Sequence, residues 1–165
     1  MTFKASKPVD HSKIIAAIEV KSGPASLRQF IKNVAAQGVT AVHAAAFRRL
    51  VEILPEEEPG TVEHDFWRTI FAFEQLLRKE RGKTVLLSRT RQKLKRVGVM
   101  QTLNDFATAT ATTQGFDMLI ARSLPELTGE AVILRHEDKF EPEVVTAASA
   151  RLAAAGVDVA ALLTG

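Results

Sequence analysis

Helix start and stop signals recur along the whole chain, and they restrict it to a largely helical fold. Prolines and capping side chains precede segments in which apolar residues recur every three to four positions, the spacing of one helix face. The dipeptide Gly-Val follows such a segment three times, at positions 38–39, 98–99 and 156–157. Glycine readily adopts the left-handed conformation that ends a helix, and the apolar residue after it packs on the last turn. We therefore predict an all-α, compact multi-helix bundle of about seven to nine helices.

The expected helices each begin at a recognisable residue. The residues expected to cap or open these helices are Asp10, Pro24, Thr40, Thr61, Ser88, Thr113, Thr128, Pro142 and Asp158, and a further helix holds Val99, Leu103 and Phe106. The helix after Thr61 is expected to be the longest and central to the core, because apolar residues cover much of its circumference. The apolar run at 131–134 is also compatible with a buried strand, but a lone strand would have nothing to pair with, so we predict a helix.

The segment Pro55–Gly60, of sequence PEEEPG, is the clearest interruption of the helical pattern. It separates a helical lobe of residues 1–54 from a helical body of residues 61–165, which would contain the central aromatic helix. The same segment could equally be a long interhelical turn within one domain, and the modest length of the chain favours that interpretation.

Composition excludes several classes of protein. The chain has no cysteine, so it has neither disulfides nor a thiolate metal site, and we expect no cofactor. No apolar run approaches the roughly 18 residues of a membrane span. The first ten residues lack the apolar core of a signal peptide. A cytoplasmic, bacterial protein without a membrane partner is the expectation.

Positive charge is concentrated in one segment in the middle of the chain. The segment 78–96 has one acid, Glu80, and nine of the 22 basic residues, so it carries +8. The remaining 13 basic and 18 acidic residues give the rest of the chain −5. A block of like charge repels itself and favours an anionic partner. The nine basic residues are Arg78, Lys79, Arg81, Lys83, Arg89, Arg91, Lys93, Lys95 and Arg96.

On a helix that begins at Ser88, these charges form two rows. Arg89, Lys93 and Arg96 share one face, and Arg91 and Lys95 form a flanking row. Phosphates would relieve the repulsion within each row, because arginine binds them through its planar fork. We therefore predict a non-enzymatic nucleic-acid-binding protein, with DNA favoured over RNA. The expected phosphate contacts are Arg89, Lys93 and Arg96, then Arg91 and Lys95, then Arg81 and Lys83 in the preceding loop.

Two alternatives remain open for the same segment. Acids at 56–58 or near Glu126 could neutralise it within the molecule, leaving an ordinary solvated face. It could instead bind an acidic protein, with the alanine-rich helix after Pro142 packing on that partner or on a second copy, so a homo-oligomer is possible.

Several familiar motifs are incomplete. A helix-turn-helix across Gly98 would place Met100, Gln101 and Asn104 toward bases, but Asn104 is polar where such a motif packs an apolar residue. Gly82-Lys83-Thr84 resembles the end of a P-loop but lacks the earlier glycine.

The remaining polar and aromatic residues suggest no catalytic or metal site. The four histidines show no metal-binding spacing, and His64 with its neighbours is expected in solvent. Glu74, Glu126 and Glu130 are interpreted as surface carboxylates rather than catalytic groups. Trp67 and Phe71 could offer a surface for base stacking, but buried core is the favoured interpretation.

Overall fold

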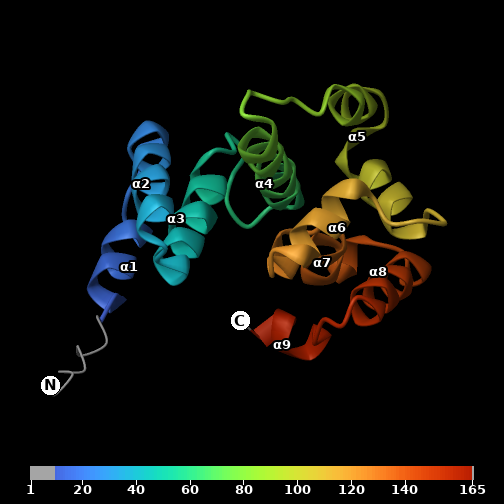
Figure 1. Cartoon of the computed structure of the whole chain (residues 1–165). Coiled ribbons are helices and arrows are strands. Elements are labelled where there is room, and N and C mark those ends of the chain that lie inside the picture. Colours follow the sequence, from blue (N-terminus) through green and yellow to red (C-terminus); the bar gives the residue numbers. More distant parts are fainter. Residues whose placement is uncertain (1–9, 165) are drawn as a thin grey trace, which may run out of the picture. The chain divides into compact units, whose positions relative to one another are not determined.

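The computed structural model describes residues 10–164, which form nine α-helices and two short 3₁₀ helices without any strand (Figure 1). This confirms the predicted all-α class. The prediction that no signal peptide is present concerns residues outside the described range. The chain divides between Leu54 and Pro55 into two compact units, each with its own core.

The first unit contains three helices, α1 (Ser12–Glu19), α2 (Pro24–Gln37) and α3 (Thr40–Ile53). Pro24 lies in the first turn of α2, and Gly38 ends that helix in the left-handed conformation at φ 72°. The core of this unit is aliphatic and consists of Ile18, Leu27, Val34, Val42, Ala46 and Leu50. The expected cap of α3 is displaced by one position, because Val39 rather than Thr40 precedes that helix. His11 precedes α1, but the Asp10 carboxylate accepts a hydrogen bond from the Ser12 N–H at 2.9 Å, as a capping side chain does.

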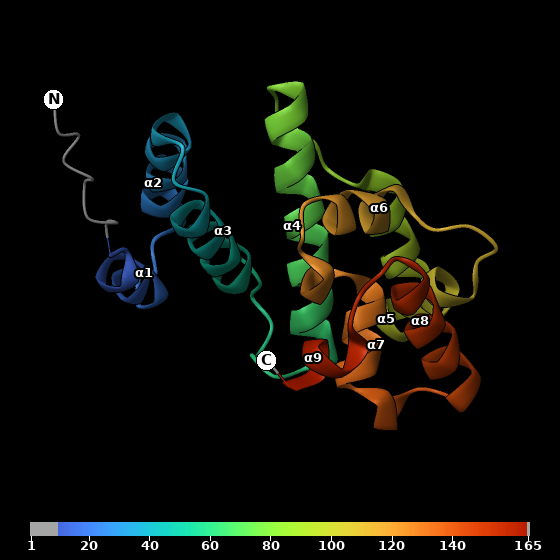
Figure 2. The same ribbon diagram turned by 60° about the horizontal axis from the view of Figure 1, so that its bottom comes forward.

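The second unit contains α4 (Val62–Arg81), α5 (Ser88–Thr108), α6 (Gln114–Ala121), α7 (Gly129–Arg135), α8 (Pro142–Ala154) and α9 (Val159–Thr164). The 3₁₀ helices η1 (Pro125–Leu127) and η2 (Glu137–Lys139) flank α7. Figure 2 shows α4 extending along this unit, with α5, α6 and α7 beside it. The core is built on Phe66, Ile70, Leu103, Val132 and Leu152.

Local signals account for the ends of α4. The Thr61 hydroxyl accepts a hydrogen bond from the His64 N–H at 3.1 Å, and Glu63 and Asp65 lie in the first turn, where the helix dipole favours acids. Gly82 ends the helix at φ 68°. The helix is therefore fixed at both ends, and the chain leaves it directly into the basic loop.

A kink at Gly98 divides α5 into two halves. Gly98 has φ 82° and ψ 173°, a conformation essentially restricted to glycine. The predicted break at Gly98-Val99 is therefore present, because α5 consists of two helical segments joined across a non-helical glycine. Leu87 precedes the helix and Ser88 is its first residue, so the predicted Ser88 cap is wrong by one position.

Candidate polyanion-binding surface

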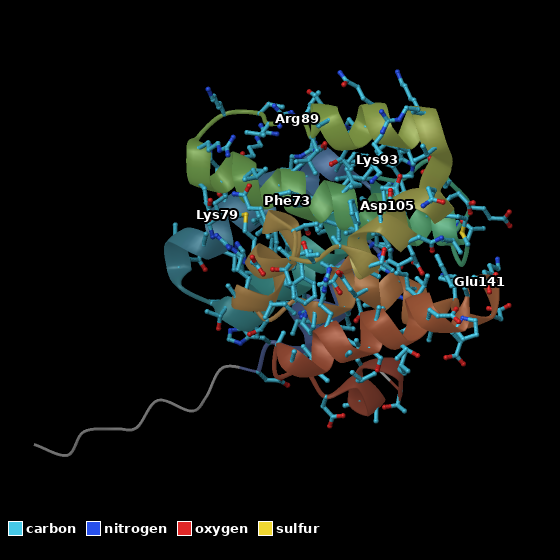
Figure 3. The ribbon with its side chains drawn as sticks, turned by 90° about the vertical axis from the view of Figure 1, so that its right-hand side faces the viewer. Phe73, Lys79, Arg89, Lys93, Asp105 and Glu141 are labelled. Atoms are coloured by element: carbon cyan, nitrogen blue, oxygen red, sulfur yellow. The ribbon has the colours of Figure 1, made fainter. Side chains whose placement is uncertain are left out.

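The basic segment occupies three consecutive elements of the second unit. Arg78, Lys79 and Arg81 lie in the last turn of α4, Lys83 lies in the connecting loop, and the remaining cations lie in the first half of α5. Figure 3 shows Arg89 and Lys93 along α5, with Lys79 on the neighbouring end of α4. The fold therefore keeps cations from two helices and a loop on one part of this unit.

Seven of the nine basic side chains are exposed and form no ion pair within residues 10–164. We call this set the cationic surface. The two other cations of the segment, Arg91 and Lys93, are half-buried and engaged within the fold. The members of the cationic surface are Arg78, Lys79, Arg81, Lys83, Arg89, Lys95 and Arg96.

Arg91 is bound to the buried carboxylate of Glu74 on α4. Its Nε and Nη2 donate to Oε1 and Oε2 of Glu74 at 2.9 and 2.8 Å, and the Leu87 N–H donates to the same Oε1 at 2.9 Å. Hydrogen bonding to Glu74 outweighs partial burial and raises the pKa of the Arg91 guanidinium. One carboxylate thus fastens both the loop and the start of α5 to α4.

The Arg91 guanidinium also lies over two aromatic rings of α4. Its Cζ is 4.9 Å from the centroid of Trp67 and 5.8 Å from that of Phe71, within the range of cation–π attraction. Both rings are half-buried, and Trp67 packs against the main core. They are therefore part of the support beneath α5, not an open stacking platform.

Lys93 forms an ion pair across the kink of α5. Its Nζ lies 2.5 Å from Oδ2 of Asp105, and Figure 3 shows the two side chains close together. Lys93, followed by Gln101 and Arg96, holds the pKa of the Asp105 carboxyl below its ordinary value. The internal partners of the basic segment are therefore Glu74 and Asp105, and Glu80, its single acid, pairs with Arg122 at 2.5 Å.

Helix dipoles separate the cationic surface into two parts. Cations in the last turn of α4 complement the negative end of that helix and stabilise it. Arg89 instead lies in the first turn of α5, which contains no acid, so the dipole opposes it. The helix dipole therefore favours the basic residues in the last turn of α4 and opposes Arg89 at the start of α5.

The residues proposed for a helix-turn-helix lie partly inside the folded body of the unit. The Gln101 amide donates to Asp105 at 2.8 Å, and Asn104 is half-buried. Val97 at the kink is exposed, whereas Leu87 and Leu94 pack against the core. The second half of α5 therefore belongs mainly to the folded body of the unit.

Two carboxylates expected on the surface are buried. Glu74 is 4% exposed and Glu130 is 2% exposed, so that expectation was wrong for both. Glu74 lies two helical turns after Trp67 and one turn after Phe71, on the same row of α4, and this spacing is a sequence signal that it faces the core.

Glu130 Oε1 lies 3.8 Å from Arg151 Nη1 and has no hydrogen-bond partner. Arg151 instead donates to the Phe106 and Ala109 carbonyls at the end of α5.

Glu130 also borders a small cavity of about 80 Å³ between α4, α5, α6 and α7. The walls are largely apolar, with Ile70, Phe73, Phe106 and Phe116 among them. Burial is the main cause that raises the pKa of the Glu130 carboxyl above 4.5, against the opposing charge of Arg151. The fold therefore favours the protonated acid.

This shift predicts the sign of a pH effect on stability. Because the folded pKa is raised, Glu130 favours folding below its unfolded pKa, and that contribution is lost as pH rises through the folded pKa. The free energy of unfolding of the wild type, measured relative to that of Glu130→Gln, should therefore be lower at about pH 8 than at about pH 4. Urea denaturation followed by fluorescence of the single tryptophan, Trp67, measures this difference. An unchanged difference between the two proteins at both pH values would contradict it.

A second charge cluster surrounds Asp65 at the start of α4. Its Oδ2 lies 2.8 Å from His136 Nε2 and 3.3 Å from Arg135 Nε, and its Oδ1 lies 3.1 Å from Arg68 Nη1. Burial would raise the pKa of the Asp65 carboxyl, but these partners outweigh it and lower the pKa. His64 and Asp65 are buried, so the expectation that they are solvated was wrong. The cluster ties α7 to α4.

The described part of the chain contains no group of three or more potential ligands able to hold a metal ion. Between residues 10 and 164, no helix combines the length and apolar character needed to span a bilayer.

Comparison of the chain with protein-family models, curated proteins and solved structures found no match.

Proposed function

We propose that this protein binds nucleic acid through the cationic surface, without catalysis. The observation that carries the proposal is that seven neighbouring cations are exposed and unpaired within the described residues, while the nearby acids Glu74, Glu80 and Asp105 already have partners. A polyanion would relieve both the mutual repulsion and the unfavourable dipole at Arg89. Phosphates along a backbone match such an array.

The mechanism is charge neutralisation with release of counterions. Contacts to phosphates from Arg78, Lys79, Arg81, Lys83, Arg89, Lys95 and Arg96 would position the nucleic acid without reading its sequence. Arg91 and Lys93 would support the surface from within, since both already bind carboxylates. We expect this protein to serve as a bacterial regulatory or accessory factor.

A salt titration tests the proposal. If about five phosphates are engaged, the logarithm of the association constant should fall with the logarithm of salt concentration with a slope of about −4 to −5 on duplex DNA. Fluorescence anisotropy of a labelled duplex of about 24 base pairs, at several salt concentrations, measures the slope. No binding at about 50 mM salt would contradict the proposal and leave an acidic protein as the partner to be tested.

A further inference from the structure

The cationic surface contains no aromatic side chain. The segment 78–97 has no Phe, Trp or Tyr, and its exposed apolar side chains are Leu86, 58% exposed, and Val97, 38% exposed. Both are aliphatic and lack a π face. Proteins that bind single strands combine cations with aromatic rings on which successive bases stack, at about 1–3 kcal/mol per base. This part of the usual single-strand site is missing.

Two aromatic rings of α4 that face α5, those of Trp67 and Phe71, are covered by the protein itself. The Arg91 guanidinium lies over Trp67 and Phe71, and two hydrogen bonds of 2.9 and 2.8 Å hold it to Glu74. A base could stack there only by displacing Arg91, which would leave the buried Glu74 carboxylate without its charge partner. Removing one partner of a buried ion pair is strongly unfavourable, so the rings are not available to bases.

The backbone that carries the cations is also held in a fixed arrangement. Six of the cations project from two helices and Lys83 projects from the loop between the helices, which is anchored by the bond from the Leu87 N–H to Glu74. A fixed backbone beneath the cations suits a fixed array of phosphates, because neither partner then has to order its backbone on binding. Duplexes have a fixed backbone and a high linear charge density of about one charge per 1.7 Å, whereas single strands are flexible.

We propose that the partner of the cationic surface is double-stranded nucleic acid, held by its phosphates, and that single strands bind only weakly. This inference rests on the proposed function. The release of counterions sets the size of the difference in affinity between duplex and single strand. The salt slopes are about −0.9 per contact for a duplex and about −0.7 for a single strand, so about five contacts make the two slopes differ by about 1. Extrapolated from equal affinity at about 1 M salt, this makes the duplex bind about 10-fold more tightly at about 0.1 M salt.

The test compares a labelled DNA duplex of about 24 base pairs with each of its component strands, chosen to lack self-complementarity, and with an RNA duplex of the same sequence. Anisotropy at about 0.1 M salt should show a duplex at least about 10-fold tighter than either strand. Tighter binding of the DNA duplex or of the RNA duplex supports the inference and assigns the duplex type, since the 2′-hydroxyl and helix form distinguish them.

Fluorescence of Trp67, the single tryptophan, gives an independent readout. Saturation with a single strand should leave its emission unchanged, because Arg91 covers the ring. Strands that bind as tightly as the duplex, or that quench Trp67, would overturn the inference while the proposed function stands. If no nucleic acid binds, the proposed function itself fails.

Discussion

Replacing Arg89 and Arg96 with glutamate is expected to weaken binding of duplex DNA by roughly 100-fold at about 0.1 M salt. Nonspecific complexes with six to ten phosphate contacts have dissociation constants of about 10⁻⁴–10⁻⁶ M, or about 0.8 kcal/mol per contact. Reversal removes one attraction and adds a repulsion of similar size, so two reversals cost about 3 kcal/mol. Both side chains are exposed on one face of α5, and neither forms an ion pair within the described residues.

The matched control is the double change Lys13→Glu and Lys32→Glu. Both lysines are exposed in the first unit, and the control alters net charge by the same −4, from +3 to −1. It should change affinity far less, and only the Arg89/Arg96 variant should flatten the salt slope by about 2. Equal losses in both variants would mean that net charge rather than the cationic surface governs binding. Unchanged urea midpoints would show that both variants are folded.

Local signals explain why so much of the fold is predictable. Caps such as Thr61, Thr113 and Thr128 bond to backbone N–H groups three residues later, and Gly38 and Gly98 take backbone conformations that other residues avoid. These interactions are complete within a few residues. Their sequence spacing is therefore enough to identify them, whereas a one-residue shift between a cap and the first helical residue, as at Ser88, depends on the geometry of the loop.

The candidate site is predictable only in part, because its pairing depends on contacts between elements. The density of charge in 78–96 is visible in the sequence, but the partners of Arg91 and Lys93 are 17 and 12 positions away along the chain. Helical spacing places Glu74 on the row of Trp67 and Phe71, so the sequence indicates a core-facing acid that needs a cationic partner. The sequence does not indicate which of the nine cations pairs with Glu74, because the loop 82–87 sets the register of α5 against α4.

Replacing Glu74 with alanine is expected to lower the free energy of unfolding of the second unit by about 3 kcal/mol. The change leaves the Arg91 guanidinium and the Leu87 N–H without their acceptor. Breaking a buried ion pair from one side costs about 3–5 kcal/mol, and Arg91 is partly exposed and can turn toward water, so the lower end applies. Urea denaturation followed by Trp67 fluorescence should show a midpoint lower by about 1–2 M.

Two further variants separate the components of this loss. Glu74→Gln keeps an oxygen acceptor for the Leu87 N–H and should cost about 1–2 kcal/mol. The double change Glu74→Met and Arg91→Met removes both charges and should also cost about 1–2 kcal/mol, chiefly because the Leu87 N–H is left unsatisfied. If the double variant were as unstable as Glu74→Ala, the unpaired charge of Arg91 would not be the cause of the stability lost in Glu74→Ala.

The same variants distinguish a supporting role from a direct one in binding. Glu74→Gln leaves the seven cations of the cationic surface in place but loosens the attachment of the loop and of α5 to α4. Affinity for duplex DNA should therefore fall by a few-fold, since ordering the loop then costs free energy on binding, while the salt slope stays the same because the number of phosphate contacts is unchanged. A flatter slope in Glu74→Gln would instead mean that Arg91, held by Glu74, is itself a phosphate contact.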